Sequence, residues 1–205
     1  MNNKFKYRLI IGLGNPGSRY DSTYHNAGQL TAERLMKMAA ETMTLAQKGK
    51  QKNFEYFKFA NGRGLIFIKP LTFMNESGEA AAESLKRFGV KPEETLVIHD
   101  DADIELGKSK LSFGRGSGGH HGIESIINGL KTKKFWRLRI GIRPKTSSVK
   151  RQAPKIKKAG LPAEAYRAKA GEMVLKKITP ADKLVLERLF SNLNPVRSPR
   201  QKKFL

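Results

Sequence analysis

The segment YRLIIGLGNPG, residues 7–17, poses the first question about the fold. Its apolar first half predicts a buried strand, and its second half matches G-x-G-x-x-G, the phosphate-binding turn of dinucleotide-binding folds. However, Pro16 stands where a helix should begin, and the next helical pattern starts only at residue 27. No second strand ends in an acidic residue about 20 residues later, since Glu33 falls inside that helix. We therefore interpret the glycines as a rigid turn that presents Asn15 to a cleft, unless Asn15 merely caps the turn.

Strand-like and helix-like segments alternate outward from this turn. Helical periodicity predicts helices over residues 27–40, 76–88 and 122–130. Apolar or alternating runs predict strands over residues 7–13, 54–59, 64–69, 95–100, 108–114 and 135–142, with a hairpin through residues 60–63. Residues 46–55 are expected to form a basic loop. This order predicts a three-layer α/β domain.

The C-terminal third differs in composition from the rest. Residues 144–177 are rich in Lys, Arg, Pro and small residues, which predicts a mobile basic flap. A Thr-Pro pair then predicts the start of a last helix over residues 179–193. Its packing side chains are expected to be Leu184, Leu186, Leu189 and Phe190. Residues 1–193 are thus expected to form a single domain, and residues 194–205 a disordered basic tail.

Composition limits the possible functions. The chain has 205 residues, 39% hydrophobic and 28% charged, and no apolar run approaches the roughly 18 residues of a membrane span. It has no cysteine, which excludes thiol nucleophiles and cysteine-bound zinc. The start of the chain lacks a secretory signal, so a cytoplasmic protein is expected. The net charge of +22 indicates a polyanionic partner. Nucleic acid is favoured over an acidic lipid surface, because basic residues occur between aromatics and in a tail.

Polar motifs follow several predicted strands. Besides the first turn they are YHNAG (24–28), KPLTFMNESG (69–78) and VIHDDADIELG (97–107). Open α/β sheets bind ligands beyond the carboxyl ends of their strands, so these motifs are expected to share a cleft. No serine stands in a G-x-S-x-G elbow. A hydrolase built on these residues would therefore use water, activated by His25 and with Asp100 orienting the imidazole, while asparagine amides stabilise the oxyanion.

The same motifs are compatible with other roles. Asn75 would be an ordinary helix N-cap, or its amide would hold a substrate carbonyl. The acidic cluster after residue 99 suggests a divalent cation, but its spacing does not match a calcium loop. A metal-dependent phosphoesterase is disfavoured because neighbouring residues tend to point to different sides and make poor chelates. Its candidate ligands would be His99, Asp100, His120 and His121.

Two further segments complete the pattern, GRGSGGHHGIESI (114–126) and FWRLRIGI (135–142). With the motifs above, they resemble the bacterial-type peptidyl-tRNA hydrolases in order and spacing, closely from residue 7 to about residue 143. The resemblance implies one α/β domain with a mixed, twisted sheet flanked by helices. It also implies hydrolysis of the ester between a peptide and the 3′ ribose of tRNA, without metal or cofactor. The expected partner is the acceptor stem and 3′ end of peptidyl-tRNA, bound by a monomer away from membranes.

The resemblance also assigns roles to individual residues. The catalytic histidine matches His25, and the aspartate paired with it matches Asp100. Two substrate-binding asparagines match Asn15 and Asn75, and an arginine that resembles a tRNA phosphate contact matches Arg139. Further substrate- or tRNA-binding residues are expected among the neighbouring motif positions, which are Tyr20, Asn26, Phe73, His120 and His121.

One motif departs from the family pattern. The glycine-rich loop usually reads G-G-H-N-G, but here His121 replaces the asparagine. A neutral imidazole also offers one donor and one acceptor, on a larger ring and in another direction. Ser112 likewise stands where the family often has lysine. Two interpretations remain: His121 replaces the amide as a hydrogen-bonding group in an active enzyme, or the chain is a non-catalytic RNA-binding relative, such as a splicing or ribosome-associated factor.

Overall fold

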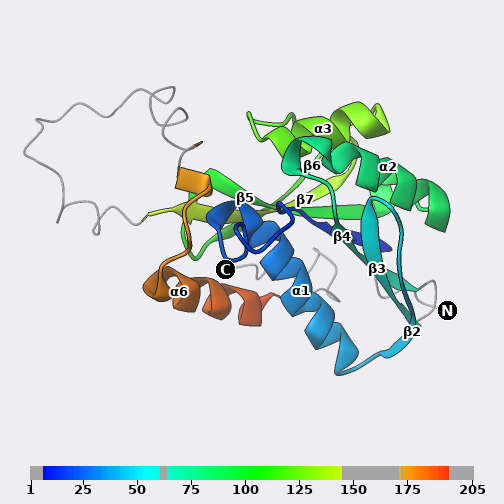
Figure 1. Ribbon diagram of the computed structural model, residues 1–205, viewed down its shortest axis with the longest axis horizontal. Coiled ribbons are helices and arrows are strands. Elements are labelled where there is room, and N and C mark those ends of the chain that lie inside the picture. The colour runs from blue at the N-terminus through cyan, green and yellow to red at the C-terminus, as the bar shows by residue number, and fades with distance from the viewer. Residues whose placement is uncertain (1–6, 61–63, 145–170, 172, 194–205) are drawn as a thin grey trace, which may run out of the picture.

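Seven strands form one mixed sheet in the computed structural model, which describes residues 7–60, 64–144, 171 and 173–193 (Figure 1). The strand order is β2-β3-β4-β1-β5-β7-β6. The central strands β4, β1, β5 and β7 are parallel, whereas β2, β3 and β6 pair antiparallel to their neighbours. Their bounds are β1 Leu9–Gly12, β2 Thr44–Lys50, β3 Phe54–Ala60, β4 Leu65–Pro70, β5 Thr95–Glu105, β6 Ser109–Phe113 and β7 Trp136–Arg143.

Helices cover both faces of the sheet. Figure 1 shows α2 and α3 on one face and α1 and α6 on the other. The α-helices are α1 Ala27–Ala40, α2 Ser77–Phe88, α3 His121–Leu130 and α6 Pro180–Asn192, and short 3₁₀ turns are η1 Tyr24–Asn26, η2 Met74–Glu76 and η3 Pro92–Glu94. The α/β class and the mixed, twisted sheet expected from the sequence are therefore confirmed.

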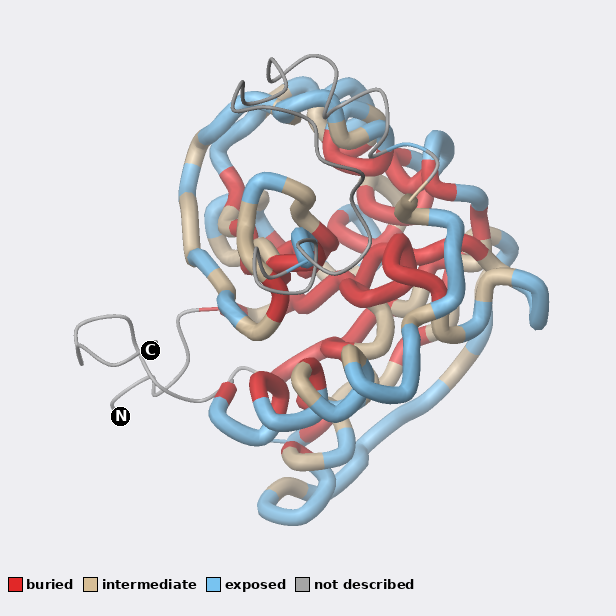
Figure 2. Tube along the Cα trace, turned by 90° about the vertical axis from the view of Figure 1, so that its left-hand side faces the viewer, coloured by how far each residue is buried: buried red, intermediate tan, exposed pale blue. Residues whose placement is uncertain are grey.

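Two apolar cores lie between these layers, as the buried segments in Figure 2 show. Successive side chains of β1 point to opposite faces of the sheet and so contribute to both cores. Ile10 packs in the core under α1 and α6, while Leu9 and Ile11 pack in the core under α2 and α3. All three are fully buried. Near-continuous apolar runs are typical of parallel strands covered on both faces.

Most elements form where the sequence predicted them. The helix over residues 27–40 is α1, and α2 ends at Gly89, which adopts a left-handed backbone with φ of 58°. The expected basic loop at residues 46–55 is wrong, since residues 44–50 form strand β2, paired with β3. Every residue of β2 except Gly49 is exposed, so this edge strand lacks the apolar alternation that would reveal it.

The last helix forms as expected, with one error. The Thr179 side chain accepts a hydrogen bond from the Asp182 amide, and Pro180 is the first helical residue. Leu186, Leu189 and Phe190 are buried, but Leu184 is 58% exposed and does not pack as predicted. The predicted flap falls mostly on residues 145–170 and 172, and the predicted tail on residues 194–205, all outside the described residues. No helix in the described ranges is long and apolar enough to cross a membrane.

A close approach between α1 and β5 fixes the position of the segment before α1. A Cβ atom on Gly28 would lie 2.3 Å from the carbonyl oxygen of Ile98. We expect Gly28→Ala to lower the free energy of unfolding by about 1–3 kcal/mol, because the backbone of α1 or β5 must move to make room for the Cβ atom. This cost exceeds the gain from the higher helix propensity of alanine. Denaturant unfolding would measure it. Gly116→Ala is the matched control, since its Cβ would meet open space; equal stability of the two variants would contradict the packing argument.

Candidate active site

A cleft of about 1090 Å³ opens beyond the carboxyl ends of the central strands. Such an edge is where open α/β sheets bind ligands. Four segments far apart in the sequence meet there: the turn after β1, the η2 segment after β4, the end of β5 and the glycine-rich loop before α3. The site residues predicted from the sequence that line it are Asn15, Tyr20, His25, Phe73, Asn75, Asp100, His120, His121 and Arg139.

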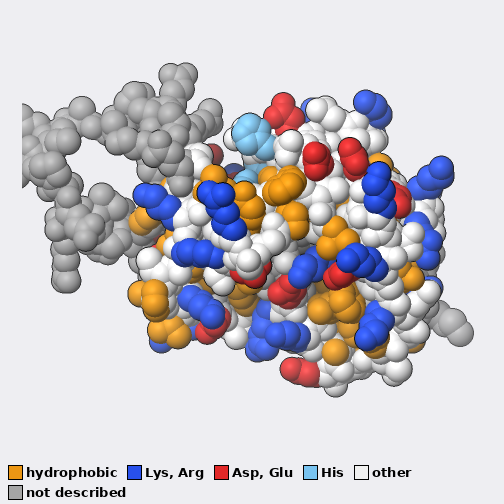
Figure 3. All heavy atoms as spheres, viewed as in Figure 1, with side chains coloured by type: hydrophobic (Ala, Val, Ile, Leu, Met, Phe, Trp, Pro, Cys, Tyr) orange, Lys and Arg blue, Asp and Glu red, His pale blue; other side chains and the backbone are white. Residues whose placement is uncertain are grey.

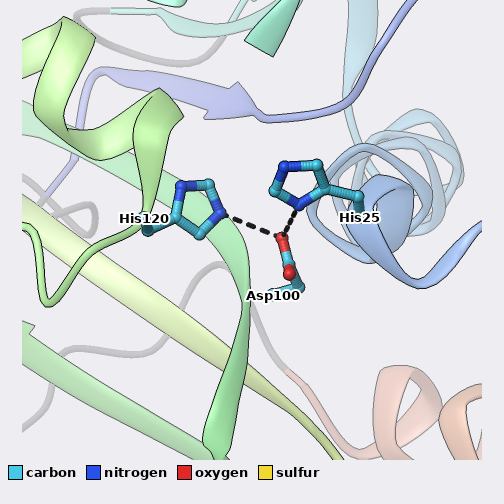
Figure 4. A group of neighbouring side chains, drawn as sticks. All are labelled: His25, Asp100 and His120. Carbon is cyan, nitrogen blue, oxygen red and sulfur yellow. Dashed lines mark hydrogen bonds and ion pairs between the residues drawn. The ribbon is translucent and has the colours of Figure 1, made fainter. Parts of the chain in front are cut away.

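Three side chains converge at the floor of this cleft (Figure 4). His25 comes from η1, Asp100 from β5, and His120 from the N-cap position of α3. His25 Nδ1 and His120 Nε2 each lie 2.9 Å from Asp100 Oδ1. One carboxylate oxygen therefore serves two imidazoles. The sequence predicted the pair of His25 and Asp100 and placed His120 in the site, but it did not predict that His120 contacts Asp100.

The hydrogen bonds around His120 define its tautomer. The backbone N–H of Ile123 donates to His120 Nδ1 at 3.3 Å, so Nδ1 bears the lone pair and Nε2 carries the hydrogen that Asp100 accepts. His25 Nδ1 faces the same carboxylate oxygen and must also donate. This leaves His25 Nε2 with a free lone pair, and within the described part of the chain no group bonds to it. His25 Nε2 is therefore the ring nitrogen of this group that could accept a proton.

The Asp100 carboxyl is held ionised. Burial by itself would raise its pKa, but the nearby imidazoles of His120 and His25 outweigh burial and hold that pKa well below its usual value. Behind it lies the fully buried His99, whose Nδ1 donates to the Asp100 carbonyl oxygen at 2.7 Å. Burial, followed by repulsion from His120, lowers the pKa of His99 well below its usual range. His99 is therefore neutral, and it is buried outside the cleft lining.

The same three side chains are also of the types that bind metal ions. His25, Asp100 and His120 are the one group among the described residues whose ligand atoms lie together, within 4.8 Å of one another. However, His120 Nε2 carries a hydrogen, because Nδ1 accepts from Ile123. In this arrangement His120 Nε2 acts as a donor to Asp100 rather than as a ligand atom. The four-residue group considered from the sequence does not assemble, since His99 is buried and His121 exposed.

The two asparagines assigned to substrate lie differently. Asn15 is 8% exposed, and its Oδ1 accepts from the Met74 backbone N–H at 2.8 Å, which ties the first turn to η2. Its Nδ2 has no hydrogen-bond partner within the described ranges. Asn75 is exposed on η2, and the N-cap of α2 is Glu76. The alternative that Asn75 caps the helix is therefore wrong.

Asn26 has its amide fully engaged. Its Oδ1 accepts from the Asn15 backbone N–H at 2.8 Å, and its Nδ2 donates to the Asn15 carbonyl at 3.0 Å. It is buried and is absent from the cleft lining. Asn26 therefore fixes the turn that carries Asn15 and lies outside the cleft lining, and the substrate-binding role expected for it stays a prediction.

Aromatic and apolar side chains form one wall of the cleft. The rings of Tyr20 and Phe73 meet edge to face with centroids 6.3 Å apart, and Phe73 is 49% exposed. Val174 and Leu175, from the segment before α6, also line the cleft. Exposed apolar surface of this kind in a cleft is typical of ligand binding.

Basic side chains from β7 line the cleft as well. Arg139 Nε donates to Asp101 Oδ2 at 2.6 Å, which sets the orientation of its guanidinium. Arg137 is buried, and its Nη1 donates to the Gly116 carbonyl of the glycine-rich loop at 2.9 Å. Burial, and then the charge of Arg139, lowers the pKa of Arg137 to about 10, so it stays cationic near neutrality. The sequence identified Arg139 but neither Asp101 nor Arg137.

Comparisons with known proteins agree with this geometry. A family model described as peptidyl-tRNA hydrolase matches residues 9–194. The peptidyl-tRNA hydrolase of Sulfurihydrogenibium sp. is 35% identical over 187 residues, covering 91% of this chain and 87% of the relative. That of Lactobacillus acidophilus is 43% identical over 143 residues, 69% of this chain and 76% of the relative.

The fold agrees with a solved structure too. The crystal structure of peptidyl-tRNA hydrolase from Acinetobacter baumannii superposes with a TM-score of 0.70 at 29% identity, covering 93% of this chain and 86% of that one. The alternative of a non-catalytic RNA-binding relative is not favoured. Since the family model spans nearly the whole chain and the relatives match along most of their length, the protein belongs to the peptidyl-tRNA hydrolase family, carboxylic ester hydrolases that act on peptidyl-tRNA.

Proposed function

We propose that His25 is the general base that activates water for cleavage of the ester between the peptide and the tRNA 3′ ribose. The observation that carries this proposal is the 2.9 Å contact of His25 Nδ1 with a buried carboxylate, which leaves Nε2 free in a large cleft. A fixed tautomer and a nearby negative charge make an imidazole a better base. No cysteine is present in the chain to act as a nucleophile.

The reaction runs through a tetrahedral intermediate. His25 Nε2 takes a proton from water as the oxygen attacks the ester carbonyl carbon. The imidazolium that forms is stabilised by the Asp100 carboxylate, which stays ionised. The intermediate then collapses, the bond to the ribose oxygen breaks, and the imidazolium returns its proton to that oxygen. The products are a free peptide acid and a tRNA with an intact 3′ hydroxyl.

Amide groups of the cleft stabilise the developing oxyanion in this proposal. Asn15 Nδ2 is a free donor on a side chain whose oxygen is already held by the Met74 N–H. Asn75 adds an exposed amide on the same η2 turn. A donor that is fixed before the reaction stabilises charge without reorganisation at the moment of attack. The aromatic wall of Tyr20 and Phe73 gives the substrate apolar surface.

His120 has a supporting part in the proposal. It donates to the same Asp100 oxygen as His25, and its other ring nitrogen is occupied by Ile123. Neither nitrogen is left for a substrate, so we revise its expected substrate-binding role. His120 instead keeps the carboxylate aimed at His25.

Phosphates of the acceptor stem are proposed to bind the basic side of the cleft. Because Arg139 Nε is held by Asp101, its terminal nitrogens are oriented and available for a phosphate. Figure 3 shows Lys and Arg side chains spread over one face of the molecule between scattered acids, which suits binding through the phosphates rather than the bases. The proposal also takes the enzyme to be a monomer in the cytoplasm.

A direct assay tests the proposed mechanism. Purified protein with EDTA should hydrolyse diacetyl-lysyl-tRNA and release the blocked amino acid from the tRNA, because no step needs a metal. Reaction in ¹⁸O-labelled water should place one labelled oxygen in the released acid, as attack on the carbonyl carbon requires. Loss of turnover in EDTA, restored by a divalent ion, would overturn the water-and-histidine mechanism.

His121 offers a second prediction. It is exposed at the first position of α3 and lines the cleft where the family pattern has asparagine. We expect His121→Asn to raise kcat/KM, by about tenfold if one substrate hydrogen bond is improved by about 1.4 kcal/mol. Steady-state kinetics of both proteins would measure it. An unchanged kcat/KM would mean that the imidazole substitutes fully for the amide.

A further inference from the structure

The segment before α6 is tied to the loop that carries His25. The Ile178 backbone N–H donates to the Ser22 carbonyl at 2.7 Å, and the Tyr24 N–H donates to the Lys176 carbonyl at 3.2 Å. Thr23 and Lys177 form an antiparallel bridge between these contacts. A short ladder therefore joins two segments about 150 residues apart in the sequence.

A side-chain contact extends this ladder to α6 itself. The Tyr24 hydroxyl donates to Asp182 Oδ2. Asp182 lies in the first turn of α6, where the Thr179 hydroxyl oxygen accepts from its backbone N–H at 3.2 Å. Tyr24 is only 8% exposed, and burial, followed by the hydrogen bond to Asp182, raises its pKa to about 12. The phenol therefore remains a donor at any pH at which peptidyl-tRNA is handled.

These contacts fix one side of His25, and the turn after β1 fixes the other. Tyr24 precedes His25 on η1 and is held by Asp182, while Asn26 follows it and is held by the backbone of Asn15. Among the described residues, Asp100 is the one hydrogen-bond partner of the imidazole, through Nδ1. The direction of Nε2 therefore depends on how η1 is seated as well as on Asp100.

We propose that Asp182 is a positioning residue for catalysis, acting through the Tyr24 hydroxyl to seat η1 and so aim His25 Nε2 into the cleft. This inference rests on the proposed role of His25 as the base. The backbone ladder, rather than this side-chain contact, holds the segment of Val174 and Leu175, which line the cleft, next to η1. Neither Tyr24 nor Asp182 contacts the reacting atoms in this arrangement, since neither lines the cleft.

Kinetics of four variants test the inference. Tyr24→Phe and Asp182→Ala should each lower kcat about tenfold, since small errors in the placement of a catalytic group cost up to about a hundredfold. KM for peptidyl-tRNA should change less than about twofold, because the binding surfaces remain. The double variant should lose no more than either single variant, as expected for two halves of one contact. Asp182→Asn should retain most of kcat, since its amide oxygen still accepts from the phenol.

A control on the same helix separates positioning from helix stability. Glu187→Ala also removes a carboxylate from α6, but that carboxylate is exposed and forms no hydrogen bond with η1 among the described residues; its kcat should match that of the wild type. Melting curves of all variants identify the fraction folded. Unchanged kcat in folded Asp182→Ala, additive losses in the double variant, or equal losses in Asp182→Ala and Glu187→Ala would each overturn the proposal.

Failure of this inference is distinguishable from failure of the proposed mechanism. If His25→Ala is inactive and Asp182→Ala is fully active, only the positioning role is wrong. If His25→Ala keeps wild-type turnover, the base is misassigned, whatever Asp182 does.

Discussion

The variant His25→Ala is expected to lower kcat for peptidyl-tRNA hydrolysis by about 10²–10⁴-fold, the contribution of a positioned general base. The reason is geometric, because His25 Nε2 is the free nitrogen of the one imidazole that combines a carboxylate partner with an open position in the cleft. His120 cannot replace it, since both of its ring nitrogens are engaged. Single-turnover hydrolysis of diacetyl-lysyl-tRNA at saturating enzyme would measure the loss.

Binding measurements accompany this experiment. Affinity of the variant for uncharged tRNA should stay within about twofold of the wild type, because phosphate contacts dominate such binding. A matched melting temperature would show that the floor of the cleft still folds. Wild-type turnover by His25→Ala, with binding intact, would show that another group activates the water.

Asp100→Asn is expected to cost about 10³-fold in kcat, although the amide has nearly the same shape. Asp100 Oδ1 accepts from both His25 and His120, and its negative charge stabilises the imidazolium that forms on His25. The amide of this variant carries no negative charge. If its NH₂ group faces His25 Nδ1 and His120 Nε2, donors meet donors and both hydrogen bonds are lost. Asp21→Asn, which alters an exposed carboxylate outside the cleft lining, should leave kcat unchanged. Losses of equal size in the two variants would contradict this role.

The free energy of unfolding of the wild type and of Asp100→Asn should depend differently on pH. The folded-state pKa of Asp100 is depressed, because the two imidazoles outweigh the opposing effect of burial. Its ionised form therefore contributes stability that is present above the unfolded pKa of about 3.9 and is lost as the pH falls toward the folded value. The wild type should lose stability below about pH 4 more steeply than Asp100→Asn. Urea unfolding between pH 6 and pH 3 would measure this. If the free energies of unfolding of the two proteins fell in parallel, the ionised carboxylate would not be stabilised by its two imidazole partners.

Particular elements show why part of the fold could be predicted from sequence. Strand β5 and helix α2 follow from local patterns, an apolar run in one and helical periodicity closed by Gly89 in the other. Strand β2 could not be predicted, because its residues are almost all exposed and show no apolar alternation, while its pairing with β3 joins it to the sheet. Leu184 fits the helical pattern of α6 yet stays exposed, because the packing of α6 decides which stripe is buried.

The site divides in the same way. Motifs at the carboxyl ends of parallel strands predicted where the cleft lies, and the absence of cysteine and of a serine elbow indicated water as the nucleophile. The pairing of His25 with Asp100 followed from resemblance together with the chemistry of an oriented imidazole. The shared oxygen with His120, the use of Asn26 on the Asn15 backbone, and the Tyr24–Asp182 contact could not follow from spacing. Each joins segments whose separation in sequence says nothing about their distance in space.

The sequence by itself determined the chemistry available to this protein: an α/β scaffold, histidine and aspartate at strand ends, a strongly basic chain and no thiol. Only the tertiary structure decided which nitrogen is free to take a proton. That choice depends on Asp100 Oδ1 accepting from His25 Nδ1 and His120 Nε2, and on Ile123 occupying His120 Nδ1. Hydrogen bonds are directional and short, so atoms from three separate elements must meet within about 3 Å before one of the two histidines is left with a ring nitrogen facing the cleft.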